Sequence, residues 1–264
     1  MAEEQKKIVP ASSLSPDKVH TWPHLVKAEF IVGLISLILI TVWSIVIDAP
    51  MEEPANPTRT PNPSKAPWYF LGLQEMLVYF DPWYAGVVLP SLIIVGLMLI
   101  PYLDINKKGV GYYTFTERKF AVSVFGFGFL ILWVFLIIIG VFFRGPGWNF
   151  FMPWQDWDTH KVVALTNIDL NIFLAQHLGI DLLRNTVVQA VFGTGLIGAY
   201  YLIGVVFYLW KVKKSPVLQE LGPIRYGLTA FLFLTMMALP IKMILRWTFN
   251  IKYIVTYPWI GLNI

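Results

Sequence analysis

The sequence predicts an all-α membrane protein with about five transmembrane helices. Hydrophobic residues make up 56% of the 264 residues and charged residues only 14%, compared with roughly 45–50% and 25% in soluble domains. Five apolar stretches reach the length of about 20 helical residues that a hydrocarbon core requires. The alternating polar and apolar pattern of barrel strands is missing, so helices are the only plausible spanning structure.

The expected spans contain most of the apolar residues. They run roughly from Leu25 to Ile47, Tyr84 to Leu103, Phe120 to Phe143, Thr186 to Trp210 and Tyr226 to Trp247. The segment 1–24 carries charges but no apolar run, so we expect a retained cytoplasmic tail rather than a cleaved signal peptide. We divide the rest into a three-helix region (25–143), an aromatic-rich extracytoplasmic interfacial segment (144–185), and two further helices with a tail (186–264).

The positions of Lys and Arg favour a cytoplasmic N-terminus and an extracytoplasmic C-terminus. Residues 1–27 and the connections 104–119 and 211–225 each hold four Lys or Arg residues, whereas the alternate connections are poorer. Because cytoplasmic loops carry the excess of positive residues, we expect the two long connections, 48–83 and 144–185, to lie outside.

Both long connections carry features of their own. The first is rich in Pro, Asn and acidic residues and is expected to contain a short helix. The second is rich in aromatic residues, and its later part, DLNIFLAQHLGIDLLRN (169–185), has apolar residues at helical spacing. We expect this part to form a helix along the membrane interface.

Cysteine and histidine usage restricts the cofactors that these residues can hold. The sequence has no cysteine, which excludes disulfides, iron–sulfur ligation, thiolate zinc sites and covalent c-type haem attachment. The four histidines, His20, His24, His160 and His177, lie outside the expected spans, so the chain cannot supply the axial pair of a membrane b-type haem. His20 and His24 are four apart, but Pro23 interrupts them, and we predict surface histidines and no metal site.

Gly193, Gly195 and Gly198 match the G-x-G-x-x-G dinucleotide pattern. They lie within an apolar span with no preceding strand, which is the wrong context for a nucleotide site. Close helix packing through small residues explains them better.

Lys242 and Arg246 lie in the last third of the final span. They either snorkel to the interface or contact a haem propionate or a lipid headgroup on a partner.

An aromatic run in the first long connection is the strongest local signal. A Pro-rich segment leads into Trp68, Tyr69 and Phe70, followed by Gln74 and Glu75. One interpretation is an amphipathic hairpin that packs on the protein's own helices. The other is a wall for an amphiphilic ring such as a quinol.

The segment Val46–Asp104 resembles the C-terminal portion of cytochrome b, more specifically subunit IV of cytochrome b6f complexes. The resemblance rests on the acidic helix end IVIDAPMEEPANPTRTP, on Ala66-Pro67-Trp68-Tyr69-Phe70 at the family's Pro-Glu-Trp-Tyr motif, and on the helix end IPYLD (100–104). The third span fits the family by position only, so about half of the chain is covered.

The resemblance implies a haem-free membrane subunit of a bc- or b6f-like quinol oxidoreductase in a bacterial inner membrane. Its expected partners are a diheme cytochrome b subunit that carries the haems b, a Rieske-type iron–sulfur protein, c-type or multihaem cytochromes, and lipid, with no nucleic acid. A quinol or quinone would bind on the positive side, and the resemblance assigns its site to Pro67, Trp68, Tyr69, Phe70 and Leu73.

The chain departs from the family at Pro67, which replaces the motif glutamate that accepts a quinol proton. Glu75 is the first candidate for the missing base: if 74–79 is helical, Trp68 and Glu75 are about two turns apart and could share a face. Asp81 is the second candidate, although it also fits a cap of the next helix.

Two rival functions remain open from the sequence. The chain could be a purely structural membrane anchor whose quinol site is inactive. A transporter is disfavoured, because no span carries a central ionisable residue and no inverted repeat is visible.

Overall fold

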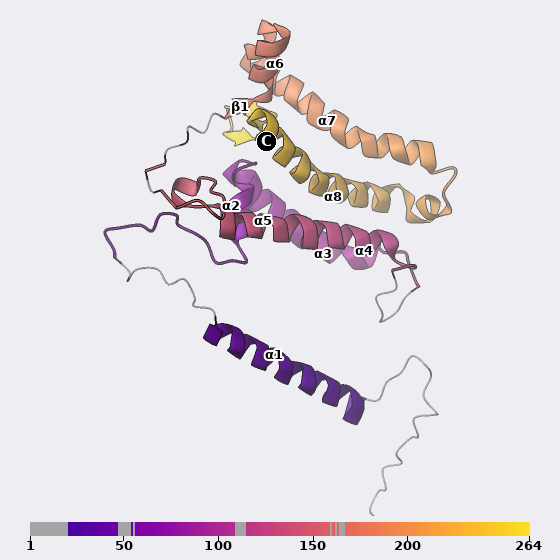
Figure 1. Ribbon diagram of the computed structural model, residues 1–264. Coiled ribbons are helices and arrows are strands. Elements are labelled where there is room, and N and C mark those ends of the chain that lie inside the picture. Colours follow the sequence, from indigo (N-terminus) through magenta and orange to yellow (C-terminus); the bar gives the residue numbers. More distant parts are fainter. Residues whose placement is uncertain are drawn as a thin grey trace, which may run out of the picture. The chain divides into compact units, whose positions relative to one another are not determined.

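Helices dominate the computed structural model (Figure 1), which describes residues 21–46, 54, 56–108, 115–158, 160, 161, 163 and 167–264. The chain divides into two units, Met1–Arg59 and Thr60–Ile264. The expected cytoplasmic tail, with His20, lies almost wholly outside the described residues.

The first unit contains α1 (Val26–Val46), preceded by the turn η2 (Thr21–Leu25). Two hydroxyl groups in this apolar helix bond to its own backbone: Thr41 Oγ1 donates to the Leu37 carbonyl and Ser44 Oγ to the Thr41 carbonyl, each at 2.8 Å. Hydroxyls satisfied in this way can enter a hydrocarbon environment. The helix confirms the first expected span.

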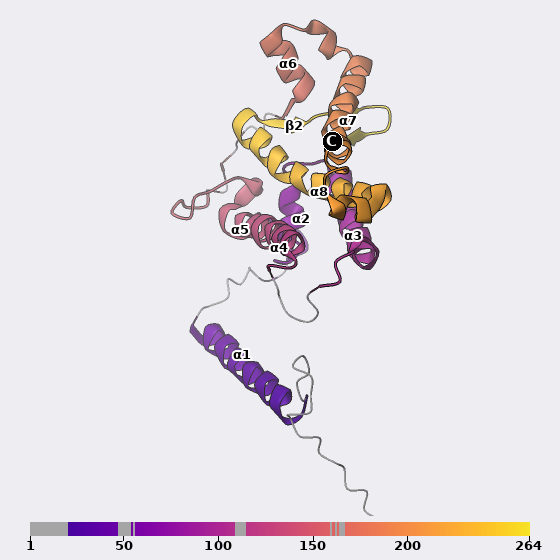
Figure 2. The same cartoon turned by 90° about the vertical axis from the view of Figure 1, so that its right-hand side faces the viewer.

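The second unit holds the other four expected spans. They are η3 (Tyr84–Val88) continuing into α3 (Leu89–Leu103); a helix made of α4 (Lys119–Phe125), η4 (Gly126–Trp133), α5 (Val134–Ile138) and η5 (Ile139–Phe143); α7 (Thr186–Lys211); and α8 (Pro216–Phe249). In Figures 1 and 2, α8 packs against both α7 and α3. Among the described residues, five helices are long and apolar enough to cross a membrane, which confirms the predicted fold class.

The last span begins ten residues earlier than the sequence indicated. Residues from Pro216 onward are already helical, and Ser215 Oγ accepts a bond from the Leu218 amide. The helix then bends at Gly222, whose φ of 73° lies in a region that glycine adopts readily and other residues rarely. Hydropathy missed this first part because Gln219, Glu220 and Arg225 interrupt the apolar run, and because Gly222 and Pro223 are unfavourable inside a helix.

The second long connection contains the expected helix, α6 (Leu170–Leu178). It ends at Gly179, where φ is 69°, and the turn η7 (Asp181–Arg184) leads into α7. Asn185 caps α7, because its Oδ1 accepts bonds from the Val187 and Val188 amides. The position of α6 along a membrane interface stays a prediction.

Short strands, which the sequence did not indicate, organise the C-terminal segment. β1 (Ile168–Asp169) pairs in parallel with β2 (Ile251–Tyr253), and β3 (Thr256–Tyr257) pairs antiparallel with β4 (Leu262–Asn263). We call the end of the unit that carries 60–83, 144–185 and 250–264 the long-loop end. The end that carries the connections 104–118 and 212–215 is the short-loop end.

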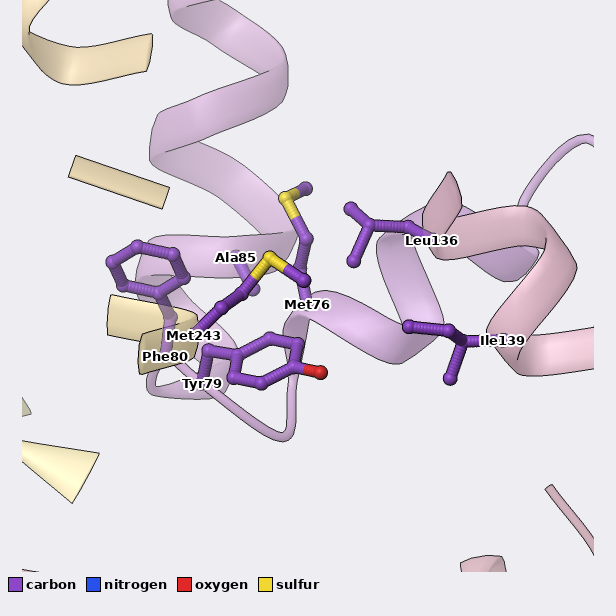
Figure 3. Close-up of a cluster of buried hydrophobic side chains, with 7 residues drawn as sticks. All are labelled: Met76, Tyr79, Phe80, Ala85, Leu136, Ile139 and Met243. Atoms are coloured by element: carbon purple, nitrogen blue, oxygen red, sulfur yellow. The ribbon is translucent and has the colours of Figure 1, made fainter. Parts of the chain in front are cut away.

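A buried hydrophobic cluster lies at the long-loop end and positions α2 (Leu71–Met76), the short helix expected in the first connection. The cluster joins side chains from α2 and the turn after it, from α5 and from α8 (Figure 3): Met76, Tyr79, Phe80, Ala85, Leu136, Ile139 and Met243. Burial of such side chains contributes about 1.5–3 kcal/mol each, so α2 is anchored from three directions.

Candidate functional site

One side of α2 is fixed against the neighbouring span. Leu71 and Met76 are buried, and a Cβ on Gly72 would lie only 3.2 Å from the ring of Trp133. A side chain here would force the ring of Trp133 to shift by a few tenths of an ångström. The remaining residues of α2, Leu73 and Gln74, are half-buried.

Four of the five predicted quinol-site residues are exposed and lie directly before α2. Trp68, Tyr69 and Phe70 are 68%, 51% and 51% exposed, and their rings contact one another at centroid distances of 5.8 and 4.7 Å. We call these three residues the aromatic triplet. Pro67 before it is exposed and Leu73 after it is half-buried, so the structure brings the five residues into one stretch of surface.

Glu75 lies on α2 and is fully buried. Arg144 donates to both of its carboxylate oxygens, from Nε to Oε2 at 2.9 Å and from Nη2 to Oε1 at 2.7 Å. Tyr79 Oη donates to Oε1 at 3.0 Å and Trp148 Nε1 to Oε2 at 3.2 Å. Burial, together with the negative charge of Glu75, raises the pKa of Tyr79, so this hydroxyl stays a donor.

This geometry does not place Glu75 beside the aromatic triplet. The helix begins only at Leu71, and Trp68 lies in the turn before it, so helical spacing does not relate Trp68 to Glu75. Four donors occupy the carboxylate, and a bidentate guanidinium pair is a strong interaction. The arrangement favours a structural role for Glu75, and its role as proton acceptor stays a prediction.

Asp81, the second candidate base, caps the following helix as the sequence suggested. Its Oδ1 accepts a bond from the Trp83 amide at 3.0 Å, and its Oδ2 from Asn263 Nδ2 at 3.3 Å. The carboxylate therefore ties the start of the second span to the C-terminal segment.

The segment before the aromatic triplet is held against α2 by side chains. Gln74 Oε1 accepts a bond from the Ala66 amide, and its Nε2 donates to the Ser64 carbonyl, both at 2.8 Å. Lys65 Nζ donates to the Val141 carbonyl at 2.8 Å and lies 4.8 Å from the ring centre of Trp157. Burial lowers the pKa of Lys65.

The expectation that Lys242 and Arg246 snorkel to the surface is wrong. Both side chains are buried, at 2% and 7% exposure. Lys242 Nζ donates to the Lys252 carbonyl, and Arg246 Nη1 to the Asn250 carbonyl at 3.0 Å. The C-terminal segment folds over the end of α8 and supplies acceptors that the sequence pattern does not reveal.

The three-glycine pattern serves packing at only one position. A Cβ on Gly193 would lie 2.6 Å from Val255 Cβ and 2.7 Å from the Ile254 carbonyl oxygen, whereas Gly195 and Gly198 have no neighbour within 4 Å. The C-terminal segment, rather than another span, occupies the space that Gly193 provides.

The described residues offer no clear metal site. In the part of the chain that the structure covers, no three His, Asp or Glu side chains gather as a metal ion would require. His160 and His177 are exposed, as is His24 in its own unit.

A cavity of about 620 Å³ at the long-loop end escaped sequence reasoning altogether. Residues from both long connections, from α8 and from β2 line it, and Arg144, Arg246 and Lys252 supply its positive charge. From the sequence, Arg144 was only one of the positive charges in the connection after the third span. The contacts of Arg144 with Glu75, 69 positions earlier, depend on tertiary packing and leave no local signal.

Comparison with known proteins finds similarity over part of the chain. Residues 54–142 match the family model described as "Cytochrome b(C-terminal)/b6/petD". A Bacillus subtilis protein named "Menaquinol:cytochrome c reductase cytochrome c subunit" is 29% identical over 187 residues, which cover 64% of each chain. A Geobacillus thermodenitrificans protein of the same name is 32% identical over 88 residues, 31% of this chain and 35% of the relative. No solved structure matches the chain.

Proposed function

We propose that the chain is a membrane subunit of a quinol oxidoreductase complex, because residues 54–142 match the model of the cytochrome b(C-terminal)/b6/petD family. Its role is to form part of a quinol site on the positive side of a bacterial inner membrane. The relatives' names supply the substrate class, menaquinol, and the acceptor class, a cytochrome c.

The exposed aromatic triplet is the observation that carries the proposal. It lies inside the family-matched region, in the turn that leads directly into α2, the helix that the buried cluster holds in place. Large aromatic rings on a rigid support suit contact with a flat, apolar quinol ring. Pro67 and Leu73 extend this surface.

Partners must complete the site. The 264 residues contain no cysteine for covalent haem attachment, and the one histidine in a candidate span, His24, lies at the end of the first span and not in its apolar centre. We therefore assign the haems b to a diheme cytochrome b subunit, and electron transfer onward to a Rieske-type protein or c-type cytochromes. The triplet would face the cytochrome b subunit, with the quinol between them.

The bonds around Glu75 favour a second candidate, a purely structural membrane anchor. Each oxygen of this carboxylate already accepts two bonds, from Arg144 and Tyr79 at Oε1 and from Arg144 and Trp148 at Oε2. In that case the chain supports the complex but takes no part in quinol oxidation.

Trp68→Leu separates the two candidates in the purified complex, because it removes a ring and keeps apolar bulk on an exposed position. We expect quinol-dependent haem reduction to fall about tenfold or more, in line with the loss of about 1–2 kcal/mol of ring contact. Trp154→Leu, at a tryptophan that is 79% exposed in the other long connection, is the matched control. Equal rates in both variants, with complete assembly, would reject the quinol site and favour the structural membrane anchor.

A further inference from the structure

The cavity at the long-loop end is walled by segments from across the second unit. Its lining comes from residues 60–64, from α2 and the turn after it, from Arg144 to Trp148, from Asn167, from Arg246 of α8 and from Lys252 of β2. Its volume of about 620 Å³ falls within the range of small-molecule sites. None of the residues of the aromatic triplet lines it.

Positive charge dominates the lining. Arg144, Arg246 and Lys252 face the cavity, and no Asp or Glu is among the lining residues. The carboxylate of Glu75 lies behind Arg144 and balances only that guanidinium. Arg144 and Arg246 are more than nine-tenths buried, so bulk water screens these charges weakly.

Two described carboxylates act on the lysines of this region. Lys242, also buried, adds a fourth cation beside Lys252, and the charge of Asp169 acts on Lys242 while that of Asp81 acts on Lys252. Within the described residues, Lys252 Nζ has neither a hydrogen bond nor an ion pair, and its contact is the ring of Tyr253 at 5.3 Å. Burial, followed by the charge of Arg246, lowers the pKa of Lys252, while Asp81 opposes the shift. An anion in the cavity would relieve this crowding.

We propose that the cavity binds the phosphate group of an anionic phospholipid, with Lys252 and the two arginines around the phosphate. The cavity opens where α8 ends, and Trp148 lines it while Trp247 nearby is 55% exposed. Tryptophans concentrate at the depth of lipid headgroups. Leu77 and Val78 give the same cavity an apolar side on which the start of an acyl chain can lie.

The test uses the intact complex, purified in a nonionic detergent and stripped of lipid by repeated exchange. Phosphatidylglycerol, phosphatidylcholine and inorganic phosphate are added separately, and native mass spectrometry measures what is bound. We expect phosphatidylglycerol to bind, and Lys252→Gln to weaken its binding about tenfold, the effect of one charge-assisted hydrogen bond. Lys214→Gln removes the same charge from an exposed position at the short-loop end and should leave binding unchanged.

Three outcomes would overturn the proposal. Equal loss of phosphatidylglycerol in both variants would show only a nonspecific effect of net charge. Binding of inorganic phosphate that depends on Lys252, without lipid binding, would make the ligand a free anion. Retention of quinone instead of phospholipid, lost in Lys252→Gln, would assign the cavity to the quinol.

Discussion

The two ends of the helical unit Thr60–Ile264 are held together in different ways. At the long-loop end, Arg144 bonds to Glu75 across 69 positions of sequence, and Asn263 bonds to Asp81 across 182. At the short-loop end, Arg118 reaches Asp104 across only 14 positions. One end depends on tertiary packing, whereas the other closes a local loop.

The two ion pairs differ as much in burial as in reach. The Glu75 side chain is fully buried and that of Arg144 is 10% exposed, whereas Asp104 and Arg118 are 37% and 27% exposed. Loss of one partner from a buried pair leaves a charge without solvation, which costs about 3–5 kcal/mol. An exposed pair contributes about 0.2–1 kcal/mol. An Arg–carboxylate pair therefore contributes much more to the stability of the long-loop end than to that of the short-loop end.

The largest expected effect follows from Glu75→Gln or Arg144→Gln. Each single change leaves the other residue buried without its counter-charge, and we expect the free energy of unfolding to fall by about 3–5 kcal/mol. The double variant should lose less than the sum of the singles, because no unpaired charge remains. Assembly yield and the thermal unfolding midpoint measure the effect. Additive losses would show that the two residues act independently.

Glu75→Gln also tests the prediction that Glu75 accepts a quinol proton. In whatever fraction of the complex assembles, loss of a general base should slow quinol-dependent haem reduction by about 10²-fold or more. The observed bonds of the carboxylate lead us to expect normal turnover per assembled complex. A 10²-fold loss in fully assembled complex would restore the catalytic role.

A smaller effect is expected from Gly193→Ala, which probes how tightly the C-terminal segment packs on α7. The new Cβ would lie 2.7 Å from the Ile254 carbonyl oxygen and 2.9 Å from Val255 Cα, so backbone must move. Overpacking of this kind costs about 1–3 kcal/mol. Gly195→Ala, two residues on and with no neighbour within 4 Å, is the control. Equal unfolding midpoints for the two variants would mean that this packing contributes little.

The spans were predictable because each depends on its own composition. Length and hydropathy located all five, and the capping signal at Asp81 agrees with the structure. The early start of α8 was missed because polar residues, Gly222 and Pro223 interrupt its first part. The pairing of β1 with β2 was missed because the two strands are far apart in sequence, and α7 and α8 lie between them.

The site was predictable only in its exposed half. The aromatic triplet follows from neighbouring residues in sequence, so the resemblance located it and the structure keeps it together. The environment of Glu75 depends on Arg144 and Trp148, each about 70 positions away. Likewise, Lys242 was expected at the surface because the segment that covers it has no pattern pointing to α8.

The smallest effect is expected at the short-loop end, from Asp104→Asn. The bond from Arg118 Nη1, at 2.6 Å, lowers the pKa of Asp104 below its ordinary value of 3.8. Between the two values the unfolded chain binds a proton that the folded chain does not, so this contribution is complete above the ordinary pKa and is lost as pH falls below it. Because both side chains are partly solvated, the loss at neutral pH should be about 0.2–1 kcal/mol. Thermal unfolding midpoints at pH 7 and near pH 3, with and without high salt, measure it, and the difference between wild type and variant should shrink at the lower pH. A loss comparable to that of Arg144→Gln would contradict the contrast between the two ends, since it would make a solvated local pair as important as a buried long-range one.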